Sequence, residues 1–189
     1  MDKVRAFVAV DVDERLRRQA ARVQEAFRPA AVSAKWVEPA LCHITVAFLG
    51  YVAAERLRDI SEACRAAAAA SRPFDLSFRG VGAFPRWRGA RVLWMGLGTG
   101  EAPLRALQHA VEAALEPLGF EPEARPFSPH LTVARFKRPP GPAIEDMGAR
   151  FERERFGAVH VGEVRLMRSD LRPSGPVYTV LDSFLLQGR

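Results

Sequence analysis

The sequence predicts an α+β fold, and three observations support this prediction. A chain of 189 residues with 48% hydrophobic residues can form one domain, or two small lobes that share a core. Segments with strand and helix patterns alternate, and most strands return as hairpins rather than through the crossovers of a parallel sheet. A tetrad containing histidine and threonine occurs twice, each time followed by a helix and then a strand, which indicates a weak internal duplication.

In the first half, segments rich in β-branched and aromatic residues predict strands, and segments with apolar residues three or four positions apart predict helices. Asp13 is suited to cap the first helix, which Pro29 ends. The expected elements are a strand at 5–12, a helix at 14–27, a short extended piece at 35–37, a strand at 41–49 that Gly50 ends, a helix at 53–70 and a half-buried strand at 74–78.

The second half opens on residues 80–91, where a strand end is expected to lead into a loop punctuated by glycine and proline. Gly119 is suited to end the helix before the second tetrad, because glycine readily adopts the left-handed conformation common after helices. The expected elements are a buried strand at 92–97, a turn at 98–100, a helix at 104–118, a strand at 129–136, a short helix at 143–152, a strand at 158–168, a turn at 173–176 and a last strand at 177–186.

The chain is basic, with a formal net charge of +6 and a pI of about 10.1. This balance favours an anionic partner such as phosphate or RNA, although a skew of genome composition toward arginine would give the same balance. The two cysteines, Cys42 and Cys64, are too few for a disulfide framework. No signal-peptide pattern opens the chain and no apolar run reaches about 18 residues, so we expect a cytoplasmic protein without a membrane segment.

The most informative pattern is the tetrad itself. Residues 43–46 read HITV and residues 130–133 read HLTV, 87 positions further on. The chain has only four histidines and four threonines. Random placement would put a threonine two residues after a histidine about 0.1 times in such a chain. Two occurrences, both in segments with strand propensity, indicate two halves of one active site.

Side chains in a strand alternate between its faces, so each tetrad presents a histidine and a threonine on one face. His43 and Thr45 form the first pair, and His130 and Thr132 form the second. Two imidazoles that flank a common cleft can act as acid and base, since their pKa lies near neutrality. The threonine hydroxyls can donate hydrogen bonds to phosphate oxygens. These groups are suited to in-line displacement at phosphorus without a metal.

The remaining histidines and Cys42 do not fit this chemistry. His109 and His160 have no matching threonine, and we interpret both as structural or surface residues. Cys42 precedes His43 and is therefore expected to face the core. Neither tetrad has a carboxylate at metal-ligand spacing in its strand, so no metal site is expected. No glycine-rich nucleotide-binding motif is present, so no cofactor is expected.

Several arginines lie where they could contact a phosphate or an RNA backbone. Arg135 follows the second tetrad, but strict alternation points it away from His130, so a bulge or strand end is needed to turn it inward. Arg86 and Arg88 flank Trp87 in a loop, which suits backbone contacts beside a stacking ring. An ordinary solvated loop is the alternative interpretation of this segment.

Beyond the tetrads, the sequence resembles the two-histidine phosphoesterase superfamily, and within it the bacterial and archaeal RNA 2′,3′-cyclic phosphodiesterases, historically named 2′-5′ RNA ligases. The resemblance extends over nearly the whole chain. The segments that carry it are residues 5–10, 36–39, 41–50, 82–86, 92–94, 125–135, 169–171 and 175–178. The paired motif is specific for the superfamily, and the flanking segments are specific for this branch.

The resemblance implies one bilobal domain over residues 1–189, with two antiparallel sheets around a central cleft and helices outside. It implies metal-independent opening of a terminal RNA 2′,3′-cyclic phosphate to a 2′-phosphate, and we expect a monomer. In relatives the first histidine is the general acid and the second the general base, which assigns these roles to His43 and His130. The resemblance further implies that Thr45 and Thr132 hold the phosphate and that Arg135 assists them.

Two alternatives stay open on the sequence alone. In the reverse direction, the same groups would join a 5′-hydroxyl to the cyclic phosphate, which is the reaction of a 2′-5′ RNA ligase. The abundance of water favours hydrolysis unless two RNA ends are held together. The other alternative is a non-catalytic RNA-binding module on the same fold, and the intact histidine and threonine pairs argue against it.

Overall fold

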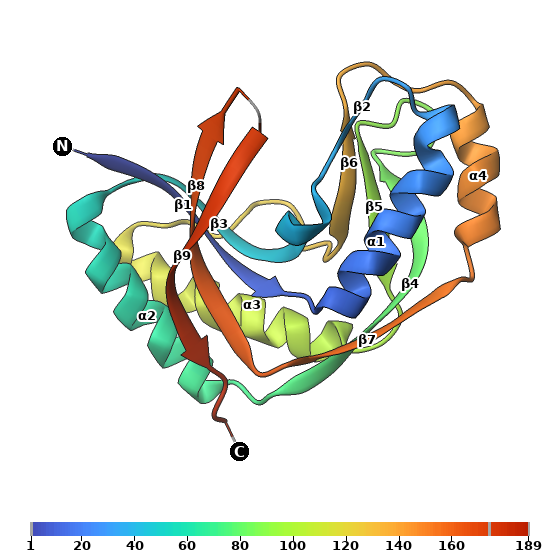
Figure 1. Ribbon diagram of the computed structural model, residues 1–189. Coiled ribbons are helices and arrows are strands. Elements are labelled where there is room, and N and C mark those ends of the chain that lie inside the picture. Colours follow the sequence, from blue (N-terminus) through green and yellow to red (C-terminus); the bar gives the residue numbers. More distant parts are fainter. Residues whose placement is uncertain (1, 174, 189) are drawn as a thin grey trace.

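The computed structural model describes residues 2–173 and 175–188, which form two antiparallel sheets with helices packed on each (Figure 1). The strands are β1 (Lys3–Asp11), β2 (Ala34–Trp36), β3 (His43–Ala53), β4 (Phe74–Phe84), β5 (Val92–Leu97), β6 (Leu131–Phe136), β7 (Arg155–Val161), β8 (Glu163–Arg172) and β9 (Gly175–Leu185). The α-helices are α1 (Glu14–Phe27), α2 (Leu57–Ala70), α3 (Glu101–Leu115) and α4 (Ala143–Phe151).

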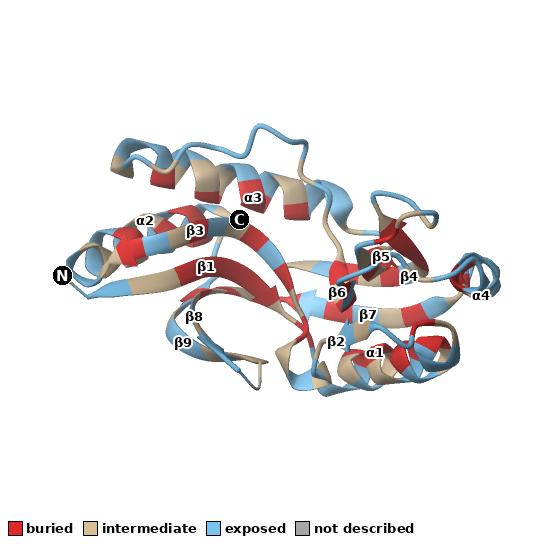
Figure 2. Ribbon diagram, turned by 90° about the horizontal axis from the view of Figure 1, so that it is seen from above, coloured by how far each residue is buried: buried red, intermediate tan, exposed pale blue. Residues whose placement is uncertain are grey.

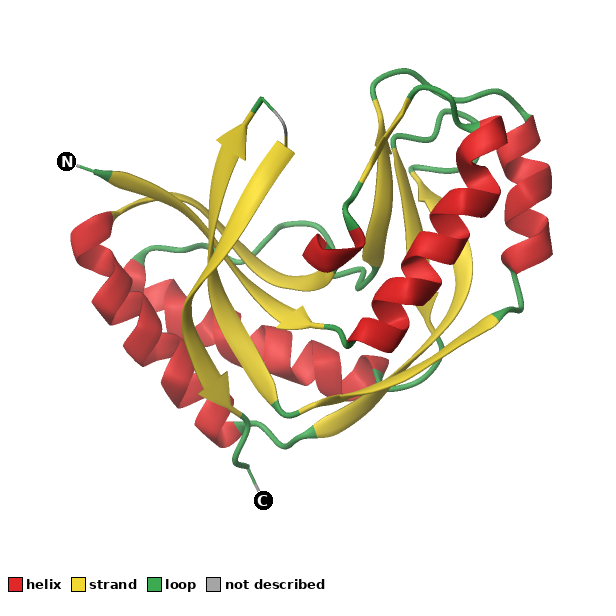
Figure 3. Ribbon diagram, viewed as in Figure 1, coloured by secondary structure: helices red, strands yellow, loops and turns green. Residues whose placement is uncertain are grey.

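Each sheet forms one lobe together with two helices. The first lobe has the strand order β3-β1-β8-β9, with α2 and α3 packed on it. The second lobe has the order β2-β6-β5-β4-β7, with α1 and α4. Figure 3 shows the α-helices outside the strands in both lobes. All the strand pairings within these two sheets are antiparallel, which confirms the predicted α+β class.

The first helix illustrates how local sequence determines an element. The side chain of Asp13 accepts a hydrogen bond from the backbone N–H of Leu16, so the predicted N-cap is confirmed. The predicted bounds of the helix, Glu14–Phe27, are those observed, and its apolar stripe is buried against the second sheet. In Figure 2 the buried positions of α1 and α3 lie on the sides that face the strands.

The aliphatic residues of the two tetrads anchor their strands in the core. Ile44 and Leu131 are fully buried, and Val46 and Val133 are buried beside them. These residues belong to one hydrophobic cluster that includes strands of both sheets. Burial of this face leaves the histidines and threonines on the opposite face, as strand alternation predicted.

The sequence prediction for the first tetrad strand is wrong at both ends. Residues 39–41 form a 3-10 turn, so the strand begins at His43 rather than at residue 41. Gly50 does not end it, because the glycine takes a left-handed φ of +69° within a bulge and the strand continues to Ala53. The second tetrad strand likewise begins later than predicted, at Leu131.

The larger error concerns the strand predicted at 158–168. The structure has two strands there, β7 and β8, which join different sheets and are separated by Gly162. Both strands alternate, but the alternation shifts by one residue at Gly162, from Val159 and Val161 to Val164 and Leu166, and the single predicted strand overlooked this shift. The strand predicted at 74–78 extends through a bulge to Phe84. Ser174 of the turn predicted at 173–176 lies outside the described residues.

The helices differ from prediction mainly at their first turns. The helix predicted from residue 53 begins at Leu57 after a 3-10 turn, and the one predicted from residue 104 begins at Glu101. The latter ends in a 3-10 turn before Gly119, which has the expected left-handed φ of +80°. Within residues 2–173 and 175–188, no helix is both long and apolar enough to cross a membrane.

Candidate active site

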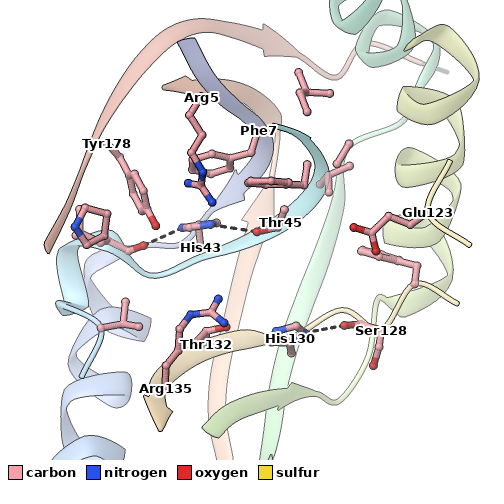
Figure 4. A pocket seen from close by; sticks show the side chains of 18 of the residues that line it. Arg5, Phe7, His43, Thr45, Glu123, Ser128, His130, Thr132, Arg135 and Tyr178 are labelled. Atoms are coloured by element: carbon pink, nitrogen blue, oxygen red, sulfur yellow. Dashed lines mark hydrogen bonds between the residues drawn. The ribbon is translucent and has the colours of Figure 1, made fainter. Parts of the chain in front are cut away.

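A cavity of about 1010 Å³ is lined by residues of both sheets, and both tetrads open into it. Its lining includes His43 and Thr45 from β3, Thr132 and Arg135 from β6, and His130 just before β6. Figure 4 shows the two histidines pointing into the same space from opposite walls. The structure therefore brings together all five residues that the sequence placed at the reaction centre.

Each imidazole is held by a hydrogen bond from Nδ1 to a backbone carbonyl oxygen, and the two bonds are equivalent. Nδ1 of His43 lies 2.8 Å from the carbonyl oxygen of Leu41, and Nδ1 of His130 lies 2.7 Å from that of Ser128. In each case the partner is two residues earlier in the chain. A carbonyl oxygen can only accept, so Nδ1 carries a proton in both rings. In the neutral form, Nε2 of each ring is therefore the basic nitrogen.

A bulge in β3 determines which side chains after the first histidine–threonine pair face the cavity. Thr45 pairs with Ala9 and Ala47 pairs with Val8, which leaves Val46 as an extra residue. The bulge shifts the alternation of the strand by one position. As a result Phe48, three residues after Thr45, faces the cavity.

The second tetrad has a bulge at the equivalent position. Thr132 pairs with Trp94 and Ala134 pairs with Leu93, which leaves Val133 as the extra residue. Arg135, three residues after Thr132, thereby lines the cavity. The bulge that the sequence required for an inward Arg135 is present. Since both tetrads bulge at their fourth residue, the internal duplication extends to backbone geometry.

Aromatic rings surround both histidines. The ring of Phe7 stacks on His43 at 4.8 Å between centroids, and Tyr178 meets His43 edge-on at 5.3 Å. Phe84 meets His130 edge-on at 5.0 Å, and Trp94 lies 6.4 Å away. These contacts restrict the orientation of both imidazole rings. Burial among them lowers the pKa of both His43 and His130.

Charged groups act differently on the two imidazoles. After burial, the hydrogen bond to Leu41 and the carboxylate of Asp11 oppose the lowering of the His43 pKa, and the charges of Arg135 and His130 lower it further. Asp11 is the strand partner of His43 and is held by Arg17 at 2.8 Å and Arg165 at 2.5 Å. For His130 the hydrogen bond to the Ser128 carbonyl opposes burial, and the guanidinium of Arg135 lowers the pKa further.

Cys42, His109 and His160, which were expected to have no catalytic role, lie away from the cavity. Cys42 is 2% exposed, and burial raises the pKa of its thiol to about 12, so it faces the core as predicted. His109 and His160 are exposed, the latter beside Asp75. Among the described residues, no cluster of three or more potential metal ligands occurs.

Trp87 does not have the environment predicted for it. Its ring stacks on Phe27 at 6.3 Å and covers Gly148 of α4, so it packs against the core of the second lobe. The sequence of this loop, in which Trp87 lies between two arginines, gave no indication of this contact. Arg86 and Arg88 are exposed on the same loop, and neither is among the described residues that line the cavity.

Four aromatic residues and one arginine at the site were missed from the sequence. Phe7, Phe84, Trp94 and Tyr178 surround the histidines, and Arg5 lines the cavity near Tyr178 (Figure 4). All five lie within segments that carry the resemblance, which is the signal that could have identified them.

Two antiparallel lobes with one histidine–threonine pair each, converging on a single cavity, define the two-histidine phosphoesterase class. The chain belongs to the 2′-5′ RNA ligase superfamily, whose family model matches residues 12–173.

Named relatives and solved structures agree with this assignment. The RNA 2′,3′-cyclic phosphodiesterase of Methanothermobacter thermautotrophicus is 39% identical over 185 residues, covering 97% of this chain and 100% of the relative. The crystal structure of TT0787 of Thermus thermophilus has a TM-score of 0.82 at 34% identity, covering 97% of this chain and 98% of that one. LigT of E. coli, crystallised with 3′-AMP, has a TM-score of 0.77 at 25% identity, covering 98% and 99%.

Proposed function

We propose that this protein hydrolyses terminal 2′,3′-cyclic phosphates of RNA to 2′-phosphates, without a metal ion. One observation carries the proposal. Two histidine–threonine pairs, one from each lobe, face one cavity, and each imidazole is held by the same Nδ1–carbonyl hydrogen bond. Acid–base catalysis at phosphorus needs two such groups on either side of the reacting phosphate. The relative from Methanothermobacter thermautotrophicus, which is named an RNA 2′,3′-cyclic phosphodiesterase, supports the substrate class.

In the proposed reaction, Nε2 of neutral His130 takes a proton from water. The water oxygen attacks phosphorus opposite the 3′ oxygen, so a new P–O bond forms while the P–O3′ bond breaks. Nε2–H of the His43 imidazolium gives its proton to the departing 3′ oxygen. The products are a 2′-phosphomonoester and a free 3′-hydroxyl, and one water molecule is consumed.

Burial and the charge of Arg135 lower the pKa of both histidines, and the carboxylate of Asp11 opposes this lowering at His43 alone. The acid must hold its proton when the substrate binds, and the carboxylate of Asp11 favours the imidazolium of His43 against burial. The base must be neutral, and at His130 burial and the charge of Arg135 favour that form. The resemblance to the family implies the same assignment.

We propose that the threonines and Arg135 hold the non-bridging oxygens of the phosphate. Thr45 Oγ1 lies 3.2 Å from Nε2 of His43, so the hydroxyl lies beside the nitrogen that must protonate the leaving oxygen. Thr132 and Arg135 occupy the corresponding wall of the second lobe. Charge-assisted bonds from a guanidinium are the strongest available to a phosphate.

Incubation of the purified protein with EDTA and an RNA ending in a 2′,3′-cyclic phosphate is expected to yield the 2′-phosphate. End-group analysis with a phosphatase and a 2′-specific chemical probe identifies the product. A chelator-sensitive reaction or a 3′-phosphate product would contradict the mechanism. Ligation products in the presence of an RNA with a 5′-hydroxyl would favour the ligase reaction. Binding without turnover would favour a non-catalytic module.

We further propose that Arg86 and Arg88 contact the RNA backbone outside the cavity, without the stacking ring first assigned to Trp87. Changing both to glutamate is expected to weaken RNA binding and to flatten its salt dependence, because each lost phosphate contact lowers the slope by about one. Affinity is measured by fluorescence anisotropy at salt concentrations from about 50 to about 300 mM. The number of phosphate contacts is given by how steeply the affinity falls with salt.

Arg72→Glu provides the matched control for this experiment. Arg72 is exposed just after α2, at the end of the first lobe where the backbone N–H of Gly188 bonds to Ser71. It should change affinity less than Arg86→Glu or Arg88→Glu made singly, although each of the three substitutions makes the same change of charge. Equal effects at Arg72, Arg86 and Arg88 would mean that only net charge matters and that the loop makes no contact.

A further inference from the structure

We infer that Arg5 forms a second anion subsite, on the first lobe, which binds the phosphodiester immediately preceding the terminal nucleotide of the RNA. The inference rests on the proposed function, since it names a further part of the same substrate. It extends that function from a reaction at one phosphate to recognition of the adjoining RNA chain.

The two bulged strands show where the second lobe has a guanidinium that the first lobe lacks. Phe48 and Arg135 are the residues that the equivalent bulges turn into the cavity, each three positions after its threonine. A phenyl ring cannot neutralise phosphate charge. The strand of the first tetrad therefore supplies no cation at the place where the second supplies Arg135.

Arg5, from the neighbouring strand β1, supplies the first lobe with a cation beside the Phe48 ring. Its guanidinium carbon lies 4.6 Å above the centre of the Phe48 ring, a distance at which cation and ring attract. One of its terminal nitrogens donates to Oγ of Ser169 at 2.8 Å. Ser169 is only 3% exposed, so the acceptor is fixed in the core of the sheet. The ring and the hydroxyl together hold the guanidinium plane, which is the preorganisation that an anion site needs.

The charge of Arg5 has no partner in the described chain. Within residues 2–173 and 175–188, no carboxylate forms an ion pair with this arginine, whereas Arg17 and Arg165 share Asp11 at the far end of β1. Arg5 is partly buried and lines the cavity. A guanidinium has five N–H donors, and the single bond to Ser169 leaves others for a ligand. An unneutralised guanidinium in a cavity is suited to a phosphate group.

The geometry favours the neighbouring phosphodiester over the reacting phosphate as the ligand. Burial is the main cause of the lowered pKa of both histidines, and Arg135 lies close enough to lower both pKa values further. Arg5 is held instead by Phe48 of β3 and Ser169 of β8, both in the first lobe. Figure 4 shows Arg5 beside Phe7 and Tyr178, on the far side of His43 from Arg135. The reacting phosphate already has Thr45, Thr132 and Arg135 as partners.

The test compares two substrates that differ by the internal phosphodiester. One is a dinucleotide ending in a 2′,3′-cyclic phosphate, and the other is the corresponding mononucleoside 2′,3′-cyclic phosphate. Arg5→Met is expected to lower the ratio of kcat/KM for dinucleotide over mononucleoside by about tenfold or more, the scale of a charge-assisted hydrogen bond. Most of the change should appear in the KM of the dinucleotide.

A dinucleotide whose internal linkage is an uncharged methylphosphonate provides the matched chemical control. The wild-type protein should lose as much on this substrate as Arg5→Met loses on the natural one, and combining the two changes should cause little further loss. Ser169→Ala, which keeps the guanidinium but frees it, should show a smaller loss with the same substrate preference. Circular dichroism and thermal unfolding check the fold of both variants.

The outcomes separate the inference from the proposed function. An equal proportional loss on both substrates, or a methylphosphonate effect that persists in full in Arg5→Met, would overturn the subsite. Failure of the wild-type protein to open either cyclic phosphate would instead overturn the proposed function. In that case, calorimetric titration of a dinucleotide with a terminal 2′-phosphate still decides the role of Arg5, because an unchanged affinity in Arg5→Met would exclude it.

Discussion

Replacing either His43 or His130 with alanine is expected to lower kcat/KM for an RNA 2′,3′-cyclic phosphate by at least about 10²-fold, the scale of positioned acid–base catalysis. Each imidazole has a basic Nε2 directed into the cavity and an Nδ1 fixed by a carbonyl oxygen. Alanine removes the proton carrier and leaves the cavity otherwise intact. Initial rates with an end-labelled RNA give the value for each variant.

His109→Ala is the matched control for both substitutions. His109 is an exposed histidine on α3, so the same chemical change there should leave the rate within about twofold of wild type. Near-full activity of His43→Ala or His130→Ala would contradict the shared site. Loss of folding, visible in thermal unfolding, is not expected, because both histidines border a cavity and not the closed core.

Replacing Arg135 with methionine is expected to lower kcat on the order of 10²-fold, the effect of removing one preorganised donor to developing charge. The same change should move the pH profile. The positive charge of Arg135 lowers the pKa of His43 and His130, in addition to the larger effect of burial. Its removal favours both imidazolium forms, so both pKa values rise and the whole bell-shaped profile moves to higher pH.

Arg138→Met, on the exposed segment just after β6, is the control for the Arg135 prediction. It removes the same charge outside the cavity and should leave the pH profile in place. A rate loss in Arg135→Met without a shift of either limb would contradict the electrostatic part of the account. A shift without a rate loss would place Arg135 near the histidines but away from the phosphate.

The sequence predicted best where the interactions are local. The bounds of α1 follow from Asp13 at its start and Pro29 beyond its end, and both signals act within one helical turn. The tetrad pairs followed from alternation over three residues, which burial of Ile44 and Leu131 enforces. These features need no knowledge of the rest of the chain.

The predictions are wrong where the chain turns from one sheet into the other and where a strand is bulged against its neighbour. Gly162 turns the chain from one sheet into the other, and the single strand expected there overlooked the one-residue shift in the alternation of buried residues. Gly50 was expected to end a strand that a bulge in fact continues. A bulge depends on the pairing of two strands, and the pairing is not visible in the sequence of one of them.

The site was predicted in its reacting groups but not in their surroundings. Trp87 was interpreted as an RNA contact because of its arginine neighbours, whereas its ring packs on Phe27 from a distant helix. The role inferred for Arg5 depends on Phe48 and Ser169, which lie 43 and 164 positions away in the sequence. Contacts at such separations are set by the fold, so the sequence pattern could not reveal them.

The central claim is that His43 and His130 act on the same phosphate as one catalytic unit. The most direct test is the rate of the double variant His43→Ala/His130→Ala beside the two single variants. Groups that act together show strongly non-additive losses. The account predicts that the double variant loses little more activity than the slower single variant. A loss equal to the product of the two single losses would show independent contributions and would contradict the shared site.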